Sequence, residues 1–178
     1  MADQLSAKDW LDQGLRALAR DGFTALKAEP LAKAMGVSRG SFYWHFADVE
    51  AFHAAILEHW REVAAERIIA DIDAAAGKDN APQLLLQRVF GEKLALENAV
   101  RQWAVVDPAA RAAVQAIDRR RLDYVERLLR KAGFSRDVAR ARAQILYWAY
   151  LGFALSHRSP AANQQRAILK EMIRIASP

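Results

Sequence analysis

The stretch Gly36–Phe46, GVSRGSFYWHF, gathers side chains that suit contact with DNA rather than the breaking of bonds. Its guanidinium can hydrogen-bond a guanine or a phosphate, and a serine hydroxyl can bond to either. The tyrosine and histidine rings offer polar edges to a sugar–phosphate backbone, the tryptophan offers an apolar face to a thymine methyl group or a sugar, and a glycine leaves room for close approach. The residues concerned are Arg39, Gly40, Ser41, Tyr43, Trp44 and His45.

Five ring side chains follow one another from Phe42 to Phe46. They cannot all face a core, because an α-helix turns about 100° per residue. Phe42 and Phe46 are four residues apart and can share a buried face. Each of the other three rings, taken singly, is more often a core residue than a contact residue. An exposed cluster of aromatic side chains, however, usually marks a binding surface.

Short helices and a turn must position these groups. A helix is predicted over Glu29–Met35, with Gly36 suited to the left-handed conformation that closes it. Ser38 is predicted to cap a third helix that ends near Phe46, and an amphipathic helix that ends near Gly22 precedes both. This is a helix-turn-helix pattern, in which the start of the second helix enters the DNA major groove.

The rest of the chain also has helical periodicity and no convincing strand pattern, so the fold class is all-α. Further helices are predicted over about 48–76, 82–99, 107–132, 135–157 and 162–176. The longest uncharged apolar run, Ile145–Leu155, is shorter than the roughly 20 residues that a membrane span needs. The chain begins without a signal-peptide pattern. We therefore expect a cytoplasmic protein with no membrane partner.

Signs of catalysis and of metal binding are missing from the sequence. There is no cysteine, no HExxH spacing, no phosphate-binding glycine loop and no nucleophile elbow. These features predict a protein that is not an enzyme, with no catalytic residues, no cofactor and no metal. The net charge of +5 permits a polyanionic partner. The basic run from Arg119 to Lys131 is either a patch for an anionic ligand or DNA, or a solvated helix face.

Residues 4–64 resemble the DNA-binding domain of TetR-type transcriptional regulators, through GFTAL, LAKAMGVSRGSFYWHF and ADVEAF. The resemblance implies a helix-turn-helix over residues 27–46, with Ser38–Phe46 as the recognition helix. Val49 departs from the family pattern, which usually has a lysine at the start of the fourth helix, so one phosphate contact is missing. The implied DNA contacts are Ala28, Glu29, Ser38, Arg39, Gly40, Ser41, Tyr43, Trp44 and His45.

Residues 65–178 are expected to form a helical effector-binding and dimerisation domain. The stretch 102–133, which contains Trp103, the Asp107–Pro108 turn and Tyr124, resembles the ligand-domain core of many TetR-type regulators. Residues that can line an effector pocket are Phe90, Leu94, Trp103, Tyr124, Leu128 and Trp148. Ordinary core packing is the alternative for each of them.

A dimer is expected because Ile145–Leu155 is apolar all round its helix, and in a small chain one face then needs a partner. The expected interface, formed by the last two helices, consists of Leu151, Gly152, Leu155, Ile168, Leu169, Met172 and Ile173. The sequence thus predicts about nine helices, beginning with a three-helix DNA-binding domain. The implied function is that of a homodimeric repressor that leaves a palindromic operator on double-stranded DNA when it binds a small apolar effector. The alternatives are an effector-independent, nucleoid-type DNA-binding dimer and an enzyme that carries a helix-turn-helix.

Overall fold

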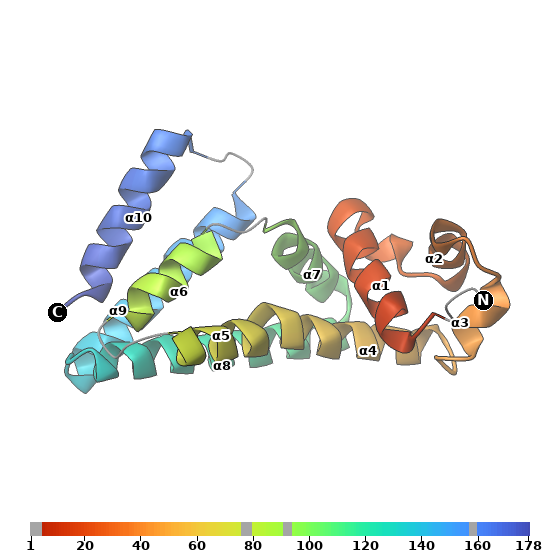
Figure 1. Ribbon diagram of the computed structural model, residues 1–178, viewed down its shortest axis with the longest axis horizontal. Coiled ribbons are helices and arrows are strands. Elements are labelled where there is room, and N and C mark those ends of the chain that lie inside the picture. The colour runs from red at the N-terminus through yellow and green to blue at the C-terminus, as the bar shows by residue number, and fades with distance from the viewer. Residues whose placement is uncertain (1–4, 76–79, 91–93, 157–159) are drawn as a thin grey trace. The chain divides into compact units, whose positions relative to one another are not determined.

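The computed structural model describes residues 5–75, 80–90, 94–156 and 160–178, and every regular element in these ranges is helical (Figure 1). The elements are α1 (Ala7–Asp21), η1 (Phe23–Ala25), α2 (Ala28–Met35), α3 (Arg39–Tyr43), α4 (Val49–Arg61), the π-helical segment η2 (Glu62–Glu66), α5 (Arg67–Ala75), α6 (Ala81–Phe90), α7 (Ala95–Val106), α8 (Pro108–Lys131), α9 (Arg136–Leu155) and α10 (Ala162–Ala176). Because α4, η2 and α5 follow one another without a break, the described ranges hold nine α-helical rods besides η1. The predicted all-α class is confirmed.

The chain divides into two compact units. Unit 1 comprises Met1–Val63 and Ala95–Gln115, and unit 2 comprises Ala64–Leu94 and Ala116–Pro178. The first boundary falls within η2, one residue before the predicted division between residues 64 and 65. The return of Ala95–Gln115 to unit 1 was not predicted. Its physical reason is that α7 packs against α1, with Trp103 stacked on Phe23 at 4.7 Å between ring centroids.

Unit 1 is built around an aromatic core. Trp10 of α1, Phe42 of α3 and Phe52 of α4 are fully buried, and Phe42 lies edge-to-face with both of the others at 5.4 and 5.1 Å. Gly14 of α1 allows the approach of α4, because a Cβ atom at this position would lie 2.4 Å from Cδ1 of Ile56. Contacts of this kind fix the supporting helix beneath the helix-turn-helix.

Helix starts follow the predicted caps in part. Ser6 and Asp9 form a reciprocal capping box, Asp48 accepts a hydrogen bond from the N–H of Ala51 at 2.7 Å, and Asp107 accepts one from the N–H of Ala110 at 2.8 Å. Ser38 and Ser135 also occupy N-cap positions, but their side chains make no capping hydrogen bond. Their helices are therefore held by packing rather than by the cap.

Three predicted helices differ from the structure. The recognition helix expected over Ser38–Phe46 is shorter, because α3 ends at Tyr43 and a turn at Trp44 and His45 follows it. The single helix expected over residues 82–99 is wrong, because α6 ends at Phe90 and α7 begins at Ala95. A glycine follows Phe90 in the sequence, and glycine is common where a helix ends. The helix expected over residues 48–76 is interrupted by η2, whose wider turn leaves no sequence signal of its own.

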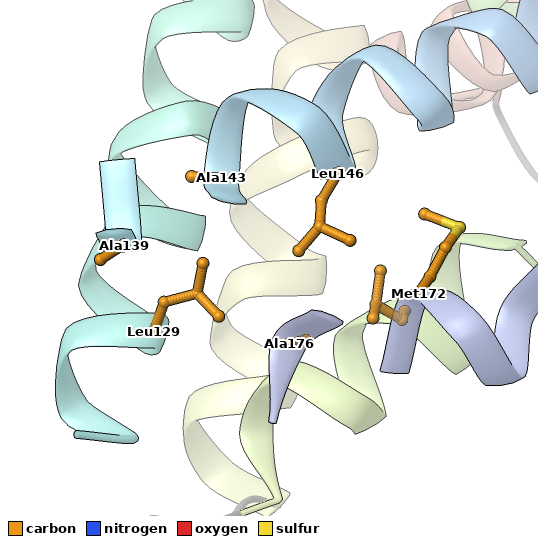
Figure 2. Packing of buried hydrophobic residues seen from close by; sticks show 7 residues of the cluster. Leu129, Ala139, Ala143, Leu146, Met172 and Ala176 are labelled. Carbon is orange, nitrogen blue, oxygen red and sulfur yellow. The ribbon is translucent and has the colours of Figure 1, made fainter. Parts of the chain in front are cut away.

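Unit 2 has its own apolar cluster, which joins α6, α8, α9 and α10. Figure 2 shows Leu129 of α8 beside small residues of α9, with Met172 and Ala176 of α10 completing the cluster. The small side chains of Ala139 and Ala143 allow α9 to lie close to its neighbours. One face of α9 is thus buried within the protomer.

Candidate nucleic-acid interface

The turn between α2 and α3 sets where α3, which carries the candidate site, begins. Gly36 closes α2 with φ 69°, a left-handed conformation that favours glycine. Its N–H and that of Val37 hydrogen-bond to the last carbonyls of α2, with Val37 N at 3.0 Å from the oxygen of Ala32. Because α2 ends in this tight turn, α3 can begin only a few residues later, with Ser38 as its N-cap.

The inner face of α3 is held by rings. Phe42 is completely buried and Phe46 is almost so, and both pack on Phe52 of α4 at 5.1 and 4.9 Å between centroids. These contacts fix the rotation of α3 about its axis. The remaining rings of the stretch are thereby turned away from the core.

The outer face of α3 and the residues that flank this helix carry the predicted contact groups. Trp44 is 86% exposed and Tyr43 is 41% exposed, whereas His45 is half-buried. A tryptophan this exposed contributes nothing to its own core, and it is the kind of side chain that anchors an interface. Ser38, Arg39 and Gly40 are exposed as well, and Ser41 is half-buried.

Arg39 is held in place on this face. Its Nη2 donates a hydrogen bond to the hydroxyl of Tyr43 at 3.0 Å, and its guanidinium lies 5.6 Å from the centre of the same ring. This hydrogen bond is the main cause that raises the pKa of Arg39 above its ordinary value, and the charge of Glu29 adds to the shift. The result is a cation that is oriented before any ligand arrives.

The start of α2 holds the other two predicted contacts in different surroundings. Glu29 is exposed in the first turn of α2, where the helix dipole stabilises a carboxylate. Ala28 is buried, so only its backbone N–H can reach a partner outside the protein. Lys27, which the sequence analysis did not single out, is exposed at the N-cap of this helix and carries a cation next to Glu29. Val49 opens α4 as a half-buried residue without a charge.

The six predicted pocket residues are divided between the units. Trp103 belongs to unit 1, where it is buried against Phe23 and lies 5.5 Å from the ring of His53. The other five belong to unit 2: Phe90 and Leu94 are half-buried, Tyr124 and Leu128 are buried, and Trp148 is 64% exposed. Tyr124 donates a hydrogen bond to Oδ1 of Asp73 at 3.0 Å.

The predicted interface residues lie on α9 and α10 of unit 2. Gly152, Leu155 and Ile168 are exposed, Leu151, Leu169 and Ile173 are half-buried, and Met172 is buried in the protomer's own cluster. Six of the exposed residues of α9 form a stripe whose spacing alternates between three and four residues: Val138, Ala141, Ile145, Trp148, Gly152 and Leu155. This spacing is that of a helix face that packs on another helix.

The described residues include neither a candidate membrane span nor a candidate metal site. No helix in this part of the chain combines the length and the apolar composition that a bilayer span requires. Among the same residues, no group of three or more histidine, aspartate or glutamate side chains is placed to hold a metal ion.

Comparison with known proteins agrees with this architecture. The family of bacterial regulatory proteins, tetR family, matches residues 11–56. The crystal structure of E. coli NemR in its reduced form has a TM-score of 0.76 at 22% identity and covers 95% of this chain and 96% of its own. A protein of Saccharomonospora viridis described as a transcriptional regulator, in complex with choline, has a TM-score of 0.73 at 17% identity, over 94% and 95% of the two chains.

A third solved structure, described as a TetR-family transcriptional regulator of Rhodococcus sp., has a TM-score of 0.70 at 16% identity and covers 97% of this chain and 98% of its own. No curated protein matches the chain. The helix-turn-helix, with exposed rings on its second helix and just after it, supports the class of DNA-binding transcriptional regulators. Residues 11–56 match the tetR family of bacterial regulatory proteins, and the chain shares its fold along nearly its whole length with these solved structures.

Proposed function

We propose that the chain is a homodimeric repressor that reads a palindromic operator through the outer face of α3. The observation that carries the proposal is the exposure of Arg39 and Tyr43 on a helix whose inner face is held by Phe42, together with the exposure of Trp44 at the C-cap of that helix. Arg39 would contact a guanine or a phosphate, and Trp44 a thymine methyl group or a sugar. Ser38, Gly40, Ser41 and His45 would complete the contact surface on the same helix and turn.

The start of α2 would contact the DNA backbone. First-turn N–H groups such as that of Ala28 have no side-chain cap, and helix N-termini favour phosphate. Lys27 would supply the cation that Val49 does not. Glu29 would face away from phosphate or accept a hydrogen bond from a cytosine amino group.

The dimer would form through the exposed stripe of α9 together with Ile168 of α10. Two copies are needed because a helix-turn-helix dimer reads two half-sites about 34–36 Å apart. Trp148 is the largest exposed side chain of the stripe, and Gly152 lets a second helix approach closely. The half-buried Leu151, Leu169 and Ile173 would border this contact, and the exposed Leu155 would take part in it as a member of the stripe.

Release by a small apolar effector is the regulatory part of the proposal. Support comes from the aromatic side chains of unit 2, among which Phe90 lies 5.4 Å from Phe153 and 6.2 Å from Tyr150. The similar regulator from Saccharomonospora viridis holds choline in its crystal structure. An effector that binds the non-DNA-binding conformation better would shift the population away from the operator.

Selection of duplex DNA from a random pool by the purified protein tests the function. The proposal predicts enrichment of an inverted repeat whose half-site centres lie about one helical turn or a multiple of it apart. Binding without any preferred sequence would favour the nucleoid-type alternative. A panel of small apolar molecules, added to the protein on the selected DNA, then tests release.

A further inference from the structure

Unit 2 contains a groove between the C-terminal half of α8 and the N-terminal half of α9. Its volume is about 750 Å³. None of the six residues predicted to line an effector pocket takes part in it. The groove is instead lined by five cationic side chains, Arg127, Arg130, Lys131, Arg136 and Arg140, and by two acidic ones, Asp123 and Glu126. We call it the α8–α9 basic groove.

Most of these cations have no acidic partner within the described ranges of the chain. Among the described carboxylates, one is approached by Arg127, that of Asp73 at 3.9 Å, and Arg127 also lies over the ring of Tyr124. Arg130, Lys131, Arg136 and Arg140 form no ion pair with any residue that the structure describes, although Asp123 and Glu126 line the same groove. By contrast, Arg120 of the same helix is paired with Glu66 at 2.9 Å.

The position of Arg136 is electrostatically unfavourable in the free protein. Arg130 and Lys131 lie in the last turn of α8, where the helix dipole favours cations. Arg136 lies in the first turn of α9, where the same effect disfavours a cation, and Arg140 follows one turn later with a like charge. A residue placed against such a local rule points to a functional constraint.

We propose that the α8–α9 basic groove binds a small organic phosphate that carries two or more negative charges. Guanidinium groups match phosphate oxygens in bidentate pairs, and Arg130, Arg136 and Arg140 present three of them from two helices. The volume lies within the roughly 300–1,000 Å³ typical of small-molecule sites. Because the cations face one groove of this size, a compact anion fits it better than a DNA duplex does.

Titration calorimetry of the full chain with sodium tripolyphosphate and with ATP, at constant ionic strength, tests the proposal. Arg136→Gln and Arg140→Gln should each weaken binding about tenfold or more, because each removes a charge-assisted hydrogen bond. Arg119→Gln is the matched control, since it removes the same charge from an exposed position of α8 outside the groove. It should leave the dissociation constant within about twofold. Without ligand, Arg136→Gln should melt at the same temperature or higher, because its cation is unfavourable there.

Three outcomes would overturn the proposal. One is that neither tripolyphosphate nor ATP binds the protein at millimolar concentration. Another is an equal loss of affinity in Arg119→Gln and Arg136→Gln, which would mean general charge attraction. The third is a groove that does not bind tripolyphosphate but binds a short DNA duplex that lacks the operator sequence, with binding that depends on Arg136 and Arg140.

Discussion

Arg39 and Tyr43 lie one turn apart on the outer face of α3, and Nη2 of the arginine donates a hydrogen bond to the tyrosine hydroxyl at 3.0 Å. The tyrosine ring itself lies edge-to-face on the buried Phe42, 5.2 Å away. The guanidinium is therefore connected to the core through a short chain of contacts. Its orientation toward DNA is set before binding, which lowers the entropy lost on contact.

Tyr43→Phe should separate this positioning effect from folding. The substitution keeps the ring on Phe42 but removes the hydroxyl, so the melting temperature should change little. Loss of the orientation of Arg39, worth at most about 1 kcal/mol in each of two half-sites, predicts an operator affinity lower by up to roughly 30-fold. Fluorescence anisotropy with the selected operator measures it. An unchanged affinity would show that Arg39 does not depend on Tyr43.

Gly14→Ala and Gly40→Ala should have opposite effects. At Gly14 the new methyl group would meet Ile56 at 2.4 Å, and such overpacking costs about 1–3 kcal/mol of unfolding free energy. At Gly40 the nearest atom is Oγ of Ser38 at 3.7 Å, so stability should be kept, while DNA affinity should fall if the backbone of α3 approaches a base. Urea unfolding and operator titration of both variants provide the comparison. Equal destabilisation by the two alanines would contradict it.

Trp148→Asp should convert the dimer into monomers. The side chain is 64% exposed in the protomer, so the fold should survive, whereas an unpaired carboxylate at the interface would cost about 3–5 kcal/mol. Val106→Asp is the control, because Val106 is 72% exposed in unit 1 and lies outside the stripe on α9. Sedimentation velocity at micromolar concentration should give a monomer for the first variant and a dimer for the second. A Trp148→Asp dimer would place the interface elsewhere.

The buried Tyr124 hydroxyl should make the free energy of unfolding decrease at alkaline pH. Burial is the main cause that raises the pKa of its hydroxyl above the ordinary value, and the hydrogen bond to Asp73 adds to it. The folded chain then keeps a proton that the unfolded chain loses above about pH 10, so stability is complete below that pH and decreases above it by up to about 1.4 kcal/mol per pH unit.

The contribution of Tyr124 is isolated by comparison with Tyr124→Phe. The difference in unfolding free energy between wild type and variant should shrink between about pH 9 and about pH 11, because the variant has no hydroxyl to titrate. Urea unfolding at several pH values measures it. A difference that stays constant over this range would mean that the Tyr124 hydroxyl ionises as readily in the folded chain as in the unfolded one.

The local features of the helix-turn-helix could be predicted from sequence because each has a local signal. The end of α2 depends only on the left-handed backbone conformation of Gly36, which glycine favours. The four-residue spacing of Phe42 and Phe46 places both rings on the buried side. The pairing of Trp103 with Phe23 could not be predicted, because residues so distant in sequence are matched only by the packing of α7 on α1. Trp148 stands on a helix that is apolar all round, and periodicity alone could not tell which side meets the protomer's own core.

The affinity of Arg39→Ala for the selected operator, measured beside Arg16→Ala, tests the central claim most directly. Both arginines are exposed in unit 1, but Arg39 lies on α3 and Arg16 on α1. A base or phosphate contact worth about 1–3 kcal/mol, lost in both half-sites, predicts that Arg39→Ala binds roughly 30-fold to 20,000-fold more weakly, with an unchanged melting temperature. Arg16→Ala should bind as the wild type does. Normal operator binding by Arg39→Ala would contradict the assignment of the outer face of α3 as the DNA-reading surface.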